Sequence, residues 1–127
     1  MENATLKRVL VLEDEEMLRL IVKDFLTVSG FETQAFADAL SAIEILKNKA
    51  YDVAIVDINM PQMSGEEFII QAKTLCPDIQ FIIHTGHSCY NVSSRLKEIG
   101  VSQNNVLIKP VENMNVFVTK IQQMCLK

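Results

Sequence analysis

The sequence predicts an α/β domain in which helices cover both faces of a parallel β-sheet. Short apolar runs such as 53–56 are rich in β-branched residues and do not alternate with polar residues, as expected of strands buried on both faces. Segments with helical apolar spacing separate these runs, and polar residues follow the carboxyl end of each run. Such a β-α repeat uses right-handed crossovers, which place helices on both sides of the sheet.

Five segments are expected to form the strands. Four are apolar runs, and the fifth alternates apolar and polar residues as an edge strand does. In chain order the predicted strands are 6–12, 31–36, 52–57, 79–83 and 106–108, of which 31–36 is the edge strand.

The first three helices have recognisable ends. The first carries apolar residues from Leu18 onward and ends near Gly30, because glycine readily adopts the left-handed conformation that closes a helix. Asp38 is placed to cap a second helix with an apolar face over 39–46. Ser64 and Glu67 have the spacing of a capping box, which begins a third helix.

The last two helical segments differ in strength. The stretch 88–98 has few apolar residues at helical spacing, so it is expected to be the least firmly packed helix. The stretch 114–125 carries a longer apolar stripe and predicts a well-packed final helix.

The predicted strands bring polar groups from distant parts of the sequence to one edge. Because parallel strands end on the same side of a sheet, Glu13, Asp14, Asp57, Thr85 and Lys109 are expected to lie together. Taken alone, Asp57 is about as well explained as a cap of the following turn. The arrival of acids, a hydroxyl and an amine at the same edge favours a functional role.

Composition favours one domain over residues 1–127 and excludes several classes of function. The chain has 127 residues, 49% of them hydrophobic, which suits a single domain. A net charge of −4 and scattered cations provide no basic surface for direct nucleic-acid binding. No membrane span is evident and residues 1–5 lack signal-peptide character, so a cytoplasmic protein with no membrane partner is expected. The three cysteines fit no metal pattern and are expected to be reduced thiols.

These motifs together resemble the receiver domain of bacterial two-component response regulators over the whole chain. The resemblance rests on the acidic pair 13–14, the segment from Asp57 through Met60-Pro61 to Gly65, the hydroxyl of Thr85, and Lys109-Pro110. It implies a flavodoxin-like (βα)5 fold with five parallel strands in the order 2-1-3-4-5. It also implies a phosphorylation-dependent signalling switch rather than an enzyme, although such a domain assists its own phosphorylation and dephosphorylation.

The resemblance also implies a role for each site residue. Asp57 would be the phosphoacceptor, and Thr85 and Lys109 would contact the phosphoryl group. Asp14 would bind Mg2+ directly and Glu13 through water, with Asp57 and the backbone carbonyl of Asn59 completing the metal ligands. Magnesium suits this set because it prefers oxygen ligands and keeps several waters. Three carboxylates and one ammonium leave a formal charge of −2, so phosphorylation should require the metal.

Three features depart from the usual receiver pattern. Glu13 stands where an aspartate is common, and Val106 stands where an aromatic residue usually changes rotamer on activation. The connection from Gly100 to Lys109 is longer by about two residues than the usual family pattern, so output from this surface is expected to differ. Pro110 is expected to follow a cis peptide bond.

The expected partners follow from the same resemblance. A histidine kinase or histidine phosphotransfer protein would supply the phosphoryl group, and a downstream protein or an output domain in the same chain would receive the signal. Receivers often dock or form homodimers through the segment 88–98, the strand 106–108 and the final helix. Lys97, Val106 and Phe117 are therefore expected near a contact surface.

Other functions remain open at this point. A flavin carrier of similar fold needs a phosphate-binding loop after the first strand, whereas residues 13–16 are all acidic. A phosphatase with an aspartyl-phosphate intermediate would need a second acid where Asn59 stands. His84 and His87 are three apart but lack a third soft ligand, so structural roles are favoured over a transition metal. A degenerate receiver that binds a partner without phosphorylation stays an alternative.

Overall fold

The computed structural model describes residues 6–125, and the expectation about residues 1–5 lies outside the described residues. Its sheet has five parallel strands in the order β2-β1-β3-β4-β5, which confirms the predicted topology. The strands are β1 (Arg8–Leu12), β2 (Glu32–Phe36), β3 (Val53–Val56), β4 (Gln80–Thr85) and β5 (Val106–Ile108).

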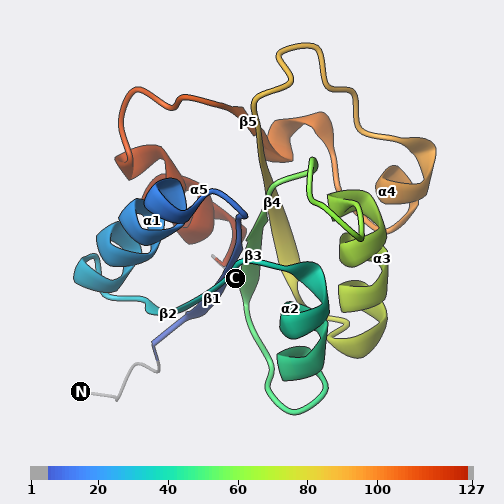
Figure 1. Cartoon of the computed structure of the whole chain (residues 1–127), viewed down its shortest axis with the longest axis horizontal. Helices are drawn as coiled ribbons and strands as arrows, with labels where there is room; N and C mark the ends of the chain where they lie inside the picture. The colour runs from blue at the N-terminus through green and yellow to red at the C-terminus, as the bar shows by residue number, and fades with distance from the viewer. Residues whose placement is uncertain (1–5, 126–127) are drawn as a thin grey trace.

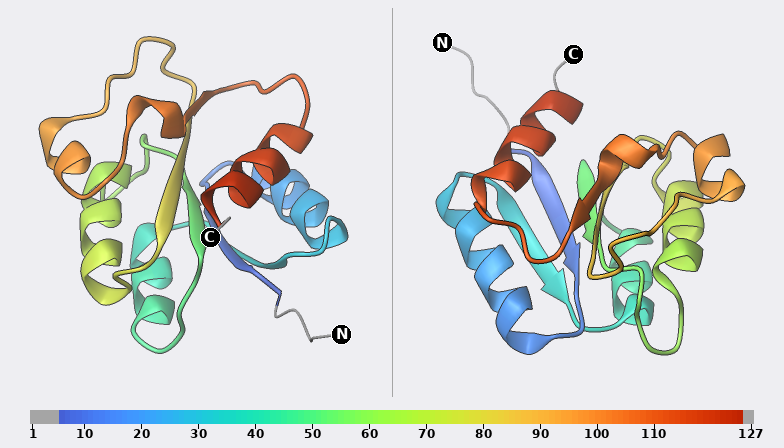
Figure 2. Two further views of the ribbon diagram at one scale, coloured as in Figure 1. Left: turned by 180° about the vertical axis from the view of Figure 1, so that it is seen from behind. Right: turned by 90° about the horizontal axis from the view of Figure 1, so that it is seen from above.

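Helices cover both faces of this sheet. Helices α1 and α5 lie on one face, and α2, α3 and α4 lie on the other (Figures 1 and 2). The helices are α1 (Glu16–Val28), α2 (Ala39–Leu46), α3 (Gly65–Leu75), α4 (Ser94–Glu98) and α5 (Asn115–Met124), with a short 3-10 turn, η1 (Gln103–Asn105), before β5. Within residues 6–125, no helix has the length and apolar character needed to cross a membrane.

Successive residues of the central strands enter two different cores. Val11 and Ile55 face α1 and α5, whereas their neighbours Leu12 and Val56 face α2 and α3. Both faces of these strands are thereby removed from water, which explains why their sequences do not alternate. The edge strand β2 is only partly buried, in agreement with its alternating sequence.

The expected helix ends are mostly confirmed. The side chain of Asp38 accepts a hydrogen bond from the backbone N–H of Ser41, and that of Ser64 accepts one from Glu67. Gly30 has a φ of 105° just after α1, in the left-handed region that favours glycine. Only the Ser64 half of the predicted capping box is formed, because the Glu67 carboxylate instead faces Gln71 and Arg95.

The fourth helix is much shorter than the sequence prediction. We expected it over 88–98, but α4 begins only at Ser94, and the residues after β4 form an irregular loop that arches over the top of the sheet in Figure 1. Ser93 caps α4 by accepting a hydrogen bond from the N–H of Leu96. The weak apolar pattern is explained by this loop, in which Val92 still reaches the core.

Close backbone packing shapes the carboxyl edge of the sheet. A Cβ atom added to Gly65 would lie 2.5 Å from the carbonyl oxygen of Asp57 and 2.7 Å from the Cα of Ile58. Only glycine allows α3 to begin so close to the end of β3. The Lys109-Pro110 peptide bond is cis, as predicted.

Candidate functional site

Three carboxylates converge at the carboxyl edge of the sheet, as predicted. Glu13 and Asp14 follow β1, and Asp57 follows β3 on the neighbouring strand. One oxygen from each lies within 4.8 Å of the others. Glu13 and Asp57 are only 3% and 6% exposed, whereas Asp14 is exposed. Two acids therefore form the floor of the site, and the third borders the solvent.

The Lys109 ammonium lies between the two buried acids. Its Nζ is 2.9 Å from Glu13 Oε1 and 3.0 Å from Asp57 Oδ2. We expected Lys109 near Asp57, but its contact with Glu13 was not foreseen. Sequence reasoning assigned Glu13 to a metal-bound water and did not consider that its longer side chain reaches the lysine.

Burial and these ion pairs change the pKa values of Glu13 and Lys109. Burial raises the pKa of Glu13, although hydrogen bonds from Lys109 and from the Glu15 N–H oppose the rise. Burial would lower the pKa of Lys109, but its hydrogen bonds to Glu13 and Asp57 outweigh that effect and raise the pKa. Lys109 is therefore held as a cation among acids.

Backbone groups fix the orientation of the acids. The Asn59 N–H donates to Asp57 Oδ1 at 3.0 Å, and the Glu15 N–H donates to Glu13 Oε2 at 3.2 Å. Arg19, which the sequence analysis missed, donates from α1 to the backbone carbonyl of Glu13 at 3.0 Å. The sequence did carry a signal for this contact, because Arg19 is a cation about one turn into the helix that follows the acidic pair.

Thr85 ends β4 directly beside Lys109. The Lys109 N–H donates to the Thr85 carbonyl at 2.8 Å, so the two residues are held on adjacent strands. The Thr85 side chain is fully buried, and its hydroxyl accepts a hydrogen bond from the His87 N–H at 3.1 Å. Its hydroxyl is therefore directed toward the loop that follows β4.

His84 has an environment that the sequence did not reveal. It is 3% exposed and packs edge-to-face on Phe117 with ring centroids 5.0 Å apart. Its Nε2 is buried without a hydrogen-bond partner among the described residues. Burial, with a contribution from the Lys109 charge, lowers the pKa of His84 to about 4. His84 is thus a neutral core residue, which agrees with the structural role favoured for it.

Phe117 corrects one expectation about the contact surface. We placed it near a docking surface, but it is fully buried in the core under α5. Its position in the apolar stripe of the final helix could have indicated this. Lys97 is exposed and Val106 is partly buried, so these two remain near the surface.

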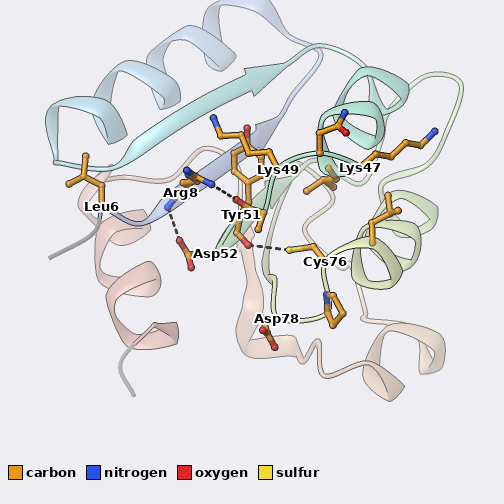
Figure 3. A pocket seen from close by; sticks show the side chains of 13 residues that line it. Leu6, Arg8, Lys47, Lys49, Tyr51, Asp52, Cys76 and Asp78 are labelled. Atoms are coloured by element: carbon orange, nitrogen blue, oxygen red, sulfur yellow. Dashed lines mark hydrogen bonds between the residues drawn. The ribbon is translucent and has the colours of Figure 1, made fainter. Parts of the chain in front are cut away.

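A separate cavity lies at the opposite edge of the sheet. It has a volume of about 620 Å³ and lies beneath the amino ends of β1 and β3, where Arg8, Tyr51 and Asp52 line it (Figure 3). Its cations already have acidic partners, since Arg8 and Lys49 both pair with Glu32. This cavity lacks the converging acids of the carboxyl edge.

Comparison with known protein families assigns the chain to one family. Residues 9–122 match the family model described as the response regulator receiver domain. The chain belongs to this receiver family. The five-strand order and the acidic cluster at the carboxyl edge agree with that assignment.

The curated relatives of this receiver include a response regulator and a phosphotransferase. It is 29% identical over 105 residues to the response regulator protein FleR of Pseudomonas aeruginosa. The matched region covers 83% of this chain but only 22% of FleR. It is 24% identical over 94 residues to sporulation initiation phosphotransferase F of Bacillus subtilis, covering 74% of this chain and 76% of that protein. The receiver therefore spans about a fifth of the first relative and most of the second.

Solved structures agree over nearly the whole receiver. A CheY-like receiver domain from Methanospirillum hungatei superposes with a TM-score of 0.78 and 28% identity, covering 94% of this chain and 93% of that one. The response regulator TrrA of Thermotoga maritima, in complex with Mg2+ and beryllofluoride, gives a TM-score of 0.79 at 26% identity, covering 94% and 99% of the two chains.

Proposed function

We propose that this receiver is a signalling switch in which Asp57 accepts a phosphoryl group from a phosphohistidine. A histidine kinase or a histidine phosphotransfer protein would present that group. The observation that carries the proposal is the convergence of Glu13, Asp14 and Asp57, with Lys109 between the two buried acids. A purely structural site would have little reason to collect three acids and one amine.

The geometry of Asp57 suits a nucleophile. Its Oδ1 is held by the Asn59 N–H and its Oδ2 faces Lys109, so the carboxylate has a defined orientation. In the transfer an Asp57 oxygen forms a bond to phosphorus while the phosphorus–nitrogen bond of the donor breaks, and the electron pair of that bond stays on the imidazole. Lys109 and the Thr85 hydroxyl would then stabilise the new phosphoryl oxygens.

The donor set fits a magnesium ion. Carboxylate oxygens of Glu13, Asp14 and Asp57 and the carbonyl of Asn59 are hard ligands, and Mg2+ commonly uses one or two carboxylates with several waters. When bound, the ion would neutralise negative charge on the attacking and phosphoryl oxygens. Without it, the acids and Lys109 carry a formal charge of −2, which repels a phosphoryl donor.

The phosphodonor partner would cover an apolar groove beside the site. Between α1 and the loop after β5, a groove of about 370 Å³ is lined by Met17, Ile21, Pro110 and Met114, and Lys109 belongs to both the groove and the acidic site. Met17 and Ile21 are 65% and 49% exposed. A partner helix that brings a phosphohistidine to Asp57 must pass over this groove, and its apolar residues would bury these side chains.

Phosphorylation would act by shifting a conformational equilibrium. Phosphoryl contacts at Thr85 and Lys109 would favour one arrangement of the loop after β4 and of the α4, β5 and α5 surface, which controls a downstream protein or an output domain. About 5.5 kcal/mol of differential contact energy would convert the population almost completely. The proposal includes a homodimer in which two receivers pair through their α4, β5 and α5 surfaces.

Intact-mass measurement after incubation with acetyl phosphate and Mg2+ tests the proposal. The wild type is expected to gain about 80 Da, the mass of one phosphoryl group in an aspartyl phosphate. The Asp57→Asn variant and wild type in EDTA are expected to gain nothing. An unmodified wild type would favour the alternative, a degenerate receiver that binds its partner without phosphorylation.

A further inference from the structure

Tyr90, in the loop after β4, has a buried hydroxyl without a hydrogen-bond partner among the described residues. Leaving such a group unpaired costs roughly 1–3 kcal/mol, so the loop conformation that buries it is held by other contacts. Tyr90 packs against the buried core cluster on the α2 and α3 face of the sheet, and Val106 packs against the same cluster. Burial and the negative charge of Glu66 raise the pKa of Tyr90.

A continuous series of contacts joins Tyr90 to the acidic site. The Thr85 hydroxyl accepts a hydrogen bond from the His87 N–H at 3.1 Å, and the His87 carbonyl accepts one from the Tyr90 N–H at 3.1 Å. The His87 and Tyr90 rings also lie edge-to-face with centroids 6.5 Å apart. A change in the Thr85 hydroxyl therefore alters a bond that positions Tyr90.

Gln103 connects the same loop to the surface before β5. Its side-chain NH2 donates to the Tyr90 carbonyl at 2.7 Å, and its side-chain oxygen accepts from the Val92 N–H at 3.0 Å. One amide side chain thus bonds the backbone on both sides of residue 91. Gln103 lies in η1, within the lengthened connection between α4 and β5.

We propose that this chain transmits the state of the Asp57 site to the η1 and β5 surface through Thr85, His87, Tyr90 and Gln103. The proposal rests on the proposed function and names the residues that carry its regulation. Val106 in β5 has no ring that could change place, whereas Tyr90 packs a ring against the same core cluster and has a hydroxyl without a partner among the described residues. When the Thr85 hydroxyl turns toward a phosphoryl group, it releases the His87 N–H. Tyr90 then moves, and Gln103 carries the displacement to η1.

The first test needs neither metal nor phosphoryl group. Thr85→Val keeps the buried volume but removes the hydroxyl that accepts from His87. In proton–nitrogen NMR spectra we expect the side-chain NH2 signals of Gln103 and the amide signal of Tyr90 to shift, while those of the exposed Asn104 stay in place. If the Gln103 signals do not move, the proposed path is wrong.

The second test separates the path from the proposed function. With Mg2+ and beryllofluoride, the wild type is expected to shift the amides of Asn59 and Lys109 and also those of Asn105 and Val106. Gln103→Ala should keep the first response and lose most of the second, whereas the neighbouring Asn104→Ala should keep both. A normal Asn105 and Val106 response in Gln103→Ala overturns the path.

The remaining outcomes are also decisive. If the wild type shifts Asn59 and Lys109 but not Asn105 or Val106, the proposed function stands and the path fails. If none of these amides responds, the proposed function fails, and the Thr85→Val comparison still decides whether the two ends of the path are connected.

Discussion

Asp14 differs from the other two acids of the site because its side chain is exposed and has no ion-pair partner among the described residues. Lys109 forms ion pairs with both Glu13 and Asp57, but it makes no such pair with Asp14. A metal ion would therefore gain most from the carboxylate of Asp14, which shares no cation with another acid.

We predict that Asp14→Asn removes stabilisation by magnesium without harming the fold. In the absence of metal, the free energy of unfolding should change by no more than about 0.5 kcal/mol, as for most exposed substitutions. With Mg2+ 100-fold above its dissociation constant, the wild type should gain about 2.7 kcal/mol, and the variant should gain little at the same concentration. Urea unfolding with and without Mg2+ measures both quantities. Equal stabilisation of the two proteins would show that Asp14 is not a ligand.

His84 predicts a specific pH dependence of stability. Its pKa is about 4 in the folded protein and about 6.5 in an unfolded chain, so the unfolded state binds more protons between these values. The contribution of neutral His84 to the free energy of unfolding is therefore fully present above pH 6.5, and it is lost as the pH falls toward 4. From pH 7 to pH 5 we expect a loss of about 2 kcal/mol.

The matched control for this pH dependence is His84→Leu. Leucine suits the apolar surroundings and removes a buried nitrogen without a partner, so the variant should be at least as stable as the wild type at pH 7. Its free energy of unfolding should fall less between pH 7 and pH 5. Urea titrations at the two pH values provide the comparison, and parallel losses in both proteins would assign the effect to other groups.

For single residues, the sequence predicts which residues form the site better than it predicts what each side chain contacts. The grouping of Glu13, Asp14, Asp57 and Lys109 followed from the ends of parallel strands. The Lys109–Glu13 contact and the burial of His84 did not, because both depend on side-chain reach and on which face of a strand a residue occupies. Because side chains two residues apart in a strand point to the same face, His84 lies on the same face of β4 as the buried Ile82.

Among the elements, α3 depends on Gly65. We predict that Gly65→Ala destabilises the protein by about 1–3 kcal/mol, because the new methyl group meets backbone atoms of Asp57 and Ile58 that cannot rotate away. Because Asp57 is displaced as well, phosphorylation by acetyl phosphate should slow. Gly86→Ala is the control, since a Cβ at Gly86 has nothing within 4 Å. Thermal unfolding that is the same for both variants would contradict the close approach.

The contrast between α3 and α4 shows where element prediction succeeds. Ser64 and Asp38 are caps followed by strong apolar faces, so local and tertiary preferences agree and the starts of α3 and α2 were predictable. The segment after β4 lacks such a face, and its loop is held instead by Gln103, which lies eleven residues from Val92. A contact of this kind leaves no periodic pattern in the sequence.

For the whole molecule, topology creates the site. The order β2-β1-β3-β4-β5 puts β1 and β3 side by side, so residues 13 and 57 meet although more than forty residues separate them. Helices cover both faces of the sheet (Figure 2), and in open parallel sheets of this kind ligands bind at the carboxyl edge of the strands. The position of the site was therefore predictable once the parallel sheet was inferred. Its ion pairs and the groove beside α1 required the structure.

Locating the modified residue tests the central claim most directly. After incubation with acetyl phosphate and Mg2+, treatment with borohydride reduces an aspartyl phosphate to homoserine, which peptide mass mapping can place in the sequence. The account predicts homoserine at position 57 alone, and none when Mg2+ is withheld. Homoserine at position 14 or any other acid, or no reduction at position 57 in fully folded protein with Mg2+ present, would contradict it.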